Sequence, residues 1–153
     1  MNILFICTGN TCRSPMAEGI MNKIAEDNDM DVHCKSAGLY AEAGAGASEE
    51  AIQAAQNIGV DISAHKAQNV SEELIKNSDL ILTMTNSHKA MLSLSSLDKP
   101  VYTLCEYAGT SGDISDPYGG DFEDYDEVCH QIYDIMLDVA ERVYDEYCKD
   151  GEE

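Results

Sequence analysis

ILFICTGNTCRSP, residues 3–15, is the stretch of this sequence that decides the fold. Its first four residues are apolar strand formers, and a loop that contains Gly9 follows them. Ser14 and Pro15 then predict the start of a helix, with Ser14 as its N-cap and Pro15 in its first turn. In open parallel sheets, ligands bind beyond the carboxyl ends of the strands. The loop of residues 7–13 is therefore where we expect a binding site.

The rest of the chain alternates between strand and helix patterns. Further strands are predicted over residues 31–36, 79–84 and 100–104. Helices are predicted over residues 48–58, from residue 71, over 87–94 and over 122–147. Gly59 is expected to end the helix over 48–58, and a glycine-rich loop over 108–120 leads into the last helix. Alternating strands and helices predict a parallel sheet covered on both faces. We expect one α/β domain over residues 1–153, a three-layer sandwich with a four-stranded parallel sheet.

The charge of the chain limits its partners. It has 29 acidic and 9 basic residues, which gives a formal net charge of −20. Such a surface repels nucleic acids and anionic membranes, so we expect neither as a partner. Solubility explains the acidity, and attraction to basic protein segments is a second explanation that the sequence leaves open.

The first residues and the cysteines indicate a compartment. The apolar segment Met1–Ile6 lacks a basic start and is too short for a signal core or for a membrane span, which needs about 20 apolar residues. The six cysteines show no CxxC spacing, and we interpret them as reduced thiols without a zinc site. We therefore expect a cytoplasmic protein with no metal and no cofactor.

Cys7 and Arg13 bracket a loop between a strand and a helix, six positions apart. Successive inward-pointing N–H groups in such a loop bind phosphate oxygens, and Gly9 is expected to let the loop curl without a Cβ clash. Arg13 supplies a planar fork that grips two oxygens at once. The same positive potential favours the thiolate form of Cys7. A buried structural cysteine is the alternative, and the Arg13-Ser14 pair that follows argues against it.

Cys7-X5-Arg13-Ser14, followed by Pro-Met-Ala-Glu, resembles the low-molecular-weight protein-tyrosine phosphatase family. The similarity continues along the chain in Ser36-Ala37-Gly38, in DISAHK at 61–66, and in Asp116-Pro117-Tyr118. The resemblance implies the fold of that family and a two-step reaction on phosphorylated proteins. Cys7 takes the phosphoryl group as phosphocysteine, and water then releases inorganic phosphate.

The resemblance also implies the roles of individual residues. Asp116 matches the general acid of the family, with Asp113 as a rival in the same loop. Asn10, Ser36 and His65 match positions that hold the loop in shape by hydrogen bonds to one another. Ser14 has a second predicted use, as a hydroxyl donor to the Cys7 thiolate. The expected substrate contacts come from the loop and from a tyrosine near the acid: Thr8, Gly9, Asn10, Thr11, Cys12, Ser14 and Tyr118. Leu39 and Tyr40 either rim the pocket or are ordinary packing residues.

Thr11 separates two branches of the resembled family. Tyrosine-specific members carry a bulky aliphatic residue at this position, whereas a Thr resembles the bacterial protein-arginine phosphatase branch. Asp-Pro-Tyr-Gly-Gly at 116–120 also resembles that branch. A hydroxyl-bearing wall can pair with the N–H groups of a guanidinium, which an aliphatic wall leaves unpaired. We therefore expect phosphoarginine as the substrate, with phosphotyrosine as the alternative.

Three further hypotheses concern the reactive thiol. A thiol-dependent arsenate reductase has a similar loop but needs two more cysteines after the third strand, and residues 80–98 contain none. A non-catalytic phosphate-binding module would not need Cys7 and Asp116 together. Cys12 lies five residues after Cys7, and we expect an oxidant to form a reversible disulfide between the two. The alternative is that Cys12 only fills space as a small buried side chain.

Overall fold

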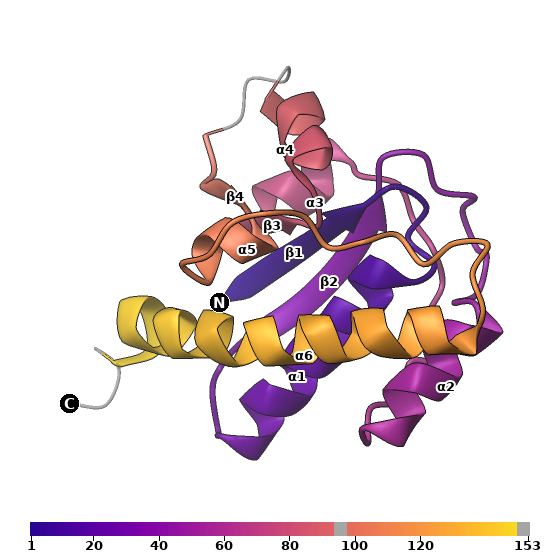
Figure 1. Ribbon diagram of the computed structural model, residues 1–153. Helices are drawn as coiled ribbons and strands as arrows, with labels where there is room; N and C mark the ends of the chain where they lie inside the picture. The colour runs from indigo at the N-terminus through magenta and orange to yellow at the C-terminus, as the bar shows by residue number, and fades with distance from the viewer. Residues whose placement is uncertain (94–97, 150–153) are drawn as a thin grey trace.

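A computed structural model (Figure 1) describes residues 1–93 and 98–149 of the chain. Four parallel strands form one sheet in the order β2-β1-β3-β4. Their bounds are β1 (Asn2–Cys7), β2 (His33–Gly38), β3 (Leu80–Thr83) and β4 (Val101–Thr103). The predicted four-stranded parallel sheet is confirmed.

The helices connect the strands and close the chain. They are α1 (Arg13–Asp27), α2 (Glu49–Asn57), α3 (Glu72–Lys76), α4 (Asn86–Ser93), α5 (Leu104–Tyr107) and α6 (Phe122–Val143), and a π-helical turn over Tyr144–Cys148 extends α6. Ser48 caps α2 with its hydroxyl, and Gly59 with φ of +82° follows the end of that helix as predicted. The helix predicted over residues 87–94 corresponds to α4, and its predicted end at Leu94 lies outside the described residues.

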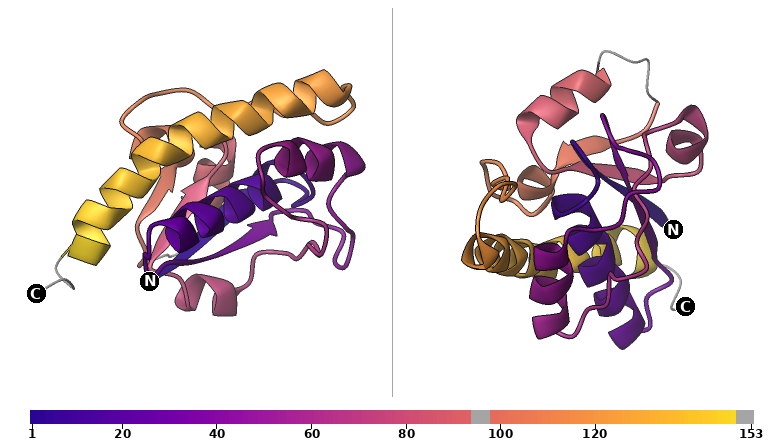
Figure 2. Two further views of the ribbon diagram at one scale, coloured as in Figure 1. Left: turned by 90° about the horizontal axis from the view of Figure 1, so that it is seen from below. Right: turned by 90° about the vertical axis from the view of Figure 1, so that its right-hand side faces the viewer.

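The alternation of side chains along β1 builds the two interfaces of the sandwich. Ile3 and Phe5 face a core that α1, α2 and α6 share, whereas Leu4 and Ile6 face a smaller cluster with residues of α3 and α4. Figure 2 shows the sheet between these two helical layers. Both faces of β1 are buried, which explains why its sequence is apolar without interruption. The predicted three-layer sandwich is therefore confirmed.

The predicted bounds of two strands, β2 and β4, are wrong, and a short helix was not predicted. β2 begins and ends two residues later than expected, because its register with β1 pairs Gly38 with Cys7. β4 ends at Thr103 because this residue caps α5: the Thr103 hydroxyl accepts from the Glu106 N–H, and the Glu106 carboxylate accepts from the Thr103 N–H. Leu104 thus belongs to a helix and not to the strand.

The carboxyl ends of the parallel strands meet at one edge of the sheet. The loop after β1, the residues after β2 and the Thr85 turn after β3 all lie at that edge, and backbone hydrogen bonds join the first two of these segments. This edge is where a ligand site is expected. Within the described residues, no helix is long and apolar enough to cross a membrane.

Candidate active site

Residues 7–13, called the phosphate loop below, leave β1 at Cys7 and enter α1 at Arg13. The loop curls at Asn10, which has a φ of +57°, and the Asn10 N–H lies 3.3 Å from the Cys7 sulfur as a donor. The prediction that Gly9 makes the curl possible is wrong. A Cβ at Gly9 would meet only the Thr11 hydroxyl oxygen, at an ordinary 3.8 Å. Asn tolerates the left-handed region better than most residues, so the strained position is filled by a suitable side chain.

Ser14 lies inside the first turn of α1 and is not its N-cap. Cys12 holds that position, without a side-chain hydrogen bond. The Ser14 hydroxyl accepts a hydrogen bond from the Asn10 amide at 2.8 Å and lies 2.8 Å from the Cys7 sulfur. Because its oxygen already accepts from Asn10, its hydrogen is free for the sulfur. The Ser14 hydroxyl thus lies within hydrogen-bond distance of the Cys7 sulfur, as its second predicted use requires.

A buried network fixes the Asn10 side chain. Its amide also donates to the Ser36 hydroxyl at 2.9 Å, and its side-chain oxygen accepts from the Gln68 N–H. Ser36 donates in turn to Glu18, whose pKa is raised chiefly by burial. The His65 Nε2 donates to the Asn10 carbonyl oxygen at 2.8 Å. Asn10, Ser36 and His65 are therefore brought together as expected, and every polar group of the Asn10 side chain is paired.

The chain after β2 holds the phosphate loop from the other side. The N–H groups of Leu39 and Tyr40 donate to the carbonyl oxygens of Cys7 and Thr8, each at 3.0 Å. Gly38 allows this approach, because a Cβ there would lie 2.5 Å from the Thr8 carbonyl oxygen. The Ser-Ala-Gly motif thus contributes both the Ser36 hydroxyl and the space for the loop.

Arg13 is 4% exposed and ties the phosphate loop to the segment before α6. One terminal nitrogen donates to the Ile114 carbonyl oxygen at 3.1 Å, and the other lies 3.5 Å from the Asp116 carboxylate. The Nε is buried and has no partner among the described residues. A buried guanidinium N–H without an acceptor is uncommon in proteins and suits a site for an anion.

The two candidate acids of this segment have different surroundings. The Asp116 side chain is 51% exposed beside Arg13, and its other oxygen accepts from the Tyr118 N–H. Asp113 instead accepts from the backbone N–H of Asn86 and from its side-chain amide, so it occupies the N-terminus of α4. The geometry places Asp116, and not Asp113, next to the phosphate loop.

A pocket of about 230 Å³ lies over the phosphate loop. Its lining residues are Cys7, Thr8, Gly9, Asn10, Thr11, Cys12, Arg13, Asp116 and Tyr118. All predicted catalytic and substrate-contacting residues line it except Ser14, which lies behind Cys7. Leu39 packs against the smaller apolar cluster and Tyr40 is exposed, and neither is among the lining residues. Burial raises the pKa of the Cys12 thiol to about 11.

Comparisons with known proteins identify this arrangement. A model of the family described as low molecular weight phosphotyrosine protein phosphatase matches residues 2–148. The chain belongs to this phosphatase family. Since the match covers nearly all described residues, the fold, the phosphate loop and the Asp116 segment all lie within it.

Relatives within this phosphatase family differ in their named activities. A protein-arginine-phosphatase of Bacillus subtilis is 35% identical over 146 residues, which cover 94% of this chain and 97% of the relative. A low molecular weight protein-tyrosine-phosphatase, PtpB of Staphylococcus haemolyticus, is 40% identical and covers 86% and 92%. A mutant of the YwlE arginine phosphatase with a phosphorylated active-site serine has a TM-score of 0.91 at 33% identity, covering 96% and 98%.

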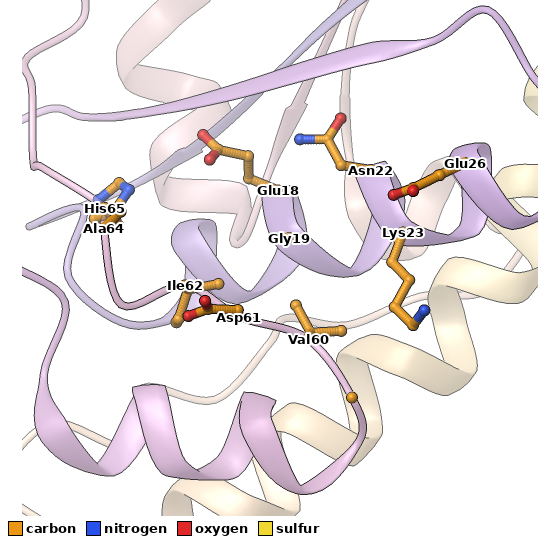
Figure 3. Close-up of a pocket in the computed structure, with 11 residues that line it drawn as sticks. Glu18, Gly19, Asn22, Lys23, Glu26, Val60, Asp61, Ile62, Ala64 and His65 are labelled. Carbon is orange, nitrogen blue, oxygen red and sulfur yellow. The ribbon is translucent and has the colours of Figure 1, made fainter.

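A larger hollow, of about 470 Å³, lies elsewhere on this phosphatase, between α1 and the segment 59–65 (Figure 3). The carboxylates of Glu18, Glu26 and Asp61 line it, and it contains no cysteine. It therefore offers no thiol nucleophile, and its three carboxylates disfavour the binding of a phosphoryl group. The residues described here include no group of three or more His, Cys, Asp and Glu side chains that could hold a metal.

The contact of His88 with the phosphate loop was not predicted. His88 on α4 is 5% exposed, and its Nε2 lies 2.8 Å from the Thr8 hydroxyl. Burial, followed by the nearby Arg13 charge, lowers the pKa of His88 to about 4. A single histidine in a short helical stretch carries no sequence signal for this contact, which the fold creates across 80 residues of chain.

Proposed function

We propose that the chain removes phosphoryl groups from arginine side chains of proteins through a phosphocysteine intermediate. The observation that carries the chemistry is that Cys7, Arg13 and Asp116 line one pocket, with the Arg13 guanidinium 3.5 Å from the Asp116 carboxylate. The two threonines of its lining, Thr8 and Thr11, support arginine as the substrate. Relatives named protein-arginine-phosphatase support it too.

In the first step the Cys7 thiolate attacks phosphorus, and an S–P bond forms as the P–N bond breaks. Loop N–H groups and Arg13 hold the phosphoryl oxygens and stabilise their charge. Asp116 gives its proton to the departing nitrogen, so the side chain leaves as a guanidinium. Phosphocysteine and an Asp116 carboxylate remain.

In the second step a water molecule attacks phosphorus from the side that arginine has left. Asp116 accepts its proton, the P–S bond breaks, and inorganic phosphate is released. The Ser14 hydroxyl donates to the sulfur as its negative charge returns. The thiolate and a protonated Asp116 are thereby restored, and no external reductant, metal or cofactor is consumed.

Phosphotyrosine is the second candidate substrate. Tyr118 at the pocket is 83% exposed and could stack against a phenyl ring, and relatives named protein-tyrosine-phosphatase have similar identity. Against it, a phenol ring gains nothing from hydroxyls at Thr8 and Thr11, whereas guanidinium N–H groups gain acceptors. We further propose that the substrates are cytoplasmic proteins, because the five buried cysteines of the described residues are thiols and not disulfides.

Side-by-side kinetics on one peptide sequence carrying either phosphoarginine or phosphotyrosine tests the proposal. We expect kcat/KM for the phosphoarginine peptide to be larger by about tenfold or more. Cys7→Ser serves as the blank and should release no phosphate from either peptide. A larger kcat/KM for phosphotyrosine would refute arginine specificity, and phosphate release by Cys7→Ser would refute the cysteine mechanism.

A further inference from the structure

His88 is held rigidly beside the phosphate loop. Its backbone N–H donates to the Thr85 hydroxyl at 3.2 Å, which caps the first turn of α4. Asp113 accepts from the Asn86 N–H at 2.8 Å and anchors the same turn to the segment that carries Asp116. The ring is almost fully buried, with Nε2 at 2.8 Å from the Thr8 hydroxyl. The helix that carries His88 is therefore joined to the acid segment through Asn86 and to the phosphate loop through the His88 ring.

The surroundings of the ring decide which nitrogen carries the proton. The Nδ1 of His88 is buried and has no partner among the described residues. A buried N–H without an acceptor costs more than an unused ring lone pair, so the proton of the neutral ring belongs on Nε2. The low pKa of His88, about 4, keeps the ring neutral at working pH. Nε2–H consequently donates to the Thr8 oxygen.

This polarity decides what Thr8 can offer to a substrate. Thr8 is exposed and lines the pocket together with Thr11 and Asp116. With one lone pair occupied by His88, its hydroxyl keeps a second lone pair and its own hydrogen. A phosphorylated guanidinium presents N–H donors beside its phosphoryl oxygens, and can use both. The bridging oxygen of a phosphotyrosine has no hydrogen to give, and its ring gains nothing from the lone pair.

We propose that His88 is a positioning residue for phosphoarginine hydrolysis, which holds the Thr8 hydroxyl so that its free lone pair accepts an N–H of the leaving guanidinium. This inference rests on the proposed arginine specificity. It assigns part of that specificity to the Thr8 hydroxyl, in addition to the Thr11 hydroxyl. His88 itself does not touch the substrate. Its whole effect passes through Thr8, and this can be measured.

The test is a double-mutant cycle with Thr8→Val and His88→Phe, two replacements of similar shape that remove one partner each. We expect each single variant to lower kcat/KM for a phosphoarginine peptide about tenfold and to change phosphotyrosine by less than about threefold. The double variant should be no worse than Thr8→Val alone. His88→Gln places an N–H donor near the position of Nε2 and should recover activity to within about threefold of wild type, whereas His88→Asn should not.

Thermal melting of each variant shows whether it is folded, so that a loss of activity can be told apart from a loss of structure. A loss shared equally by both substrates, additive with Thr8→Val and unrepaired by His88→Gln, would overturn the positioning role. Because Thr8 is exposed, Thr8→Val tests the hydroxyl even if His88→Phe does not fold. Unchanged phosphoarginine kinetics in Thr8→Val would also overturn the positioning role. A wild-type enzyme that prefers phosphotyrosine would refute the proposed function, whereas a full arginine preference in both single variants refutes only the role of His88.

Discussion

At the scale of single residues, the proposed selectivity depends on the short hydroxyl side chains of Thr8 and Thr11 at the pocket. Thr11 lines the pocket, and its own backbone is fixed by a hydrogen bond from the Ser48 N–H to its carbonyl oxygen. A change of its side chain therefore alters the pocket wall more than the loop. The preference between the two leaving groups then depends on whether the pocket wall accepts hydrogen bonds from guanidinium N–H groups or packs against a phenyl ring.

Thr11→Ile is expected to raise phosphotyrosine turnover relative to phosphoarginine turnover. The aliphatic wall packs against a phenyl ring but leaves guanidinium N–H groups unpaired, so the ratio of the two kcat/KM values should shift by about tenfold or more toward phosphotyrosine. Thr11→Ser, which keeps the hydroxyl, is the matched control and should leave the ratio within about threefold. An equal change on both substrates would contradict the pocket argument.

The oxidation of the phosphate loop is expected to depend on pH through its second cysteine, Cys12. Cys12 is buried with a pKa of about 11, so at neutral pH it is a protonated thiol and a poor attacker of an oxidised Cys7. The Cys12 thiolate fraction rises about tenfold per pH unit below that value. With peroxide, we expect the ratio of Cys7–Cys12 disulfide to Cys7 sulfinic acid to increase from pH 7 to pH 9.

Peptide mass spectrometry of peroxide-treated protein measures that ratio. Cys12→Ser is the control and should yield sulfinic acid at Cys7 at every pH, because no resolving thiol remains in the loop. A complete absence of the Cys7–Cys12 linkage at both pH values would rule the disulfide hypothesis out. Cys12 would then be a small buried side chain.

Residue types and spacing were sufficient to predict which side chains gather at the site. Cys7 and Arg13 stand out because a phosphate-binding turn requires them at that spacing, and Asp116 stands out by its motif. Local geometry was less predictable. Ser14 was expected to cap α1, yet its hydroxyl is used by Asn10 and Cys7, which lie in the loop itself. The His88 contact depends on tertiary placement alone, so no pattern in the chain could indicate it.

At the scale of elements, the site depends on how closely β2 approaches the phosphate loop. Gly38 is the last residue of β2, and its register partner is Cys7. A Cβ at Gly38 would lie 2.5 Å from the Thr8 carbonyl oxygen, 3.1 Å from the Ala41 Cβ and 3.2 Å from the Asn10 Cβ. Backbone, unlike the tip of a flexible side chain, cannot move away without changing the loop.

Gly38→Ala is therefore expected to lower kcat by about 100-fold, because a displacement of about 1 Å at the reacting groups has an effect of that size. Gly46→Ala, with nothing within 4 Å of the added Cβ, is the matched control and should retain wild-type kinetics. Steady-state kinetics and thermal melting of both variants make the comparison. Wild-type activity in Gly38→Ala would show that the loop tolerates a side chain there.

The order and kind of most elements followed from the alternation of apolar strands with amphipathic helices. The exceptions have local causes. The capping box of Thr103 and Glu106 converts a strand end into α5, and its four residues are too few for a helical period to appear. β2 extends to Gly38 because tertiary pairing with β1 continues past its apolar residues. Such boundaries are decided by partners that lie far away in sequence.

At the scale of the whole molecule, the net charge of −20 surrounds a site that must bind a dianion. The phosphate loop places Arg13 at the pocket and directs the Asn10 N–H toward the Cys7 sulfur, so positive potential is concentrated there. Beyond the loop, the surface potential repels the phosphoryl group and attracts cationic residues that flank it. We therefore expect the charge to select substrates by the residues that surround the phosphorylated side chain, before any contact with the pocket wall.

This argument predicts opposite salt responses for two phosphoarginine peptides that differ only in lysine or glutamate flanks. From about 20 to 200 mM salt, kcat/KM for the lysine-flanked peptide should fall by roughly three- to tenfold, because ions screen the attraction over about 10 Å. The glutamate-flanked peptide should improve over the same range, and kcat of either peptide should change little, because screening acts on encounter and not on the bound complex. Stopped-flow or steady-state phosphate release under subsaturating substrate measures both. If the two peptides responded alike, the acidity would serve solubility alone, and the pocket would be the sole source of selectivity.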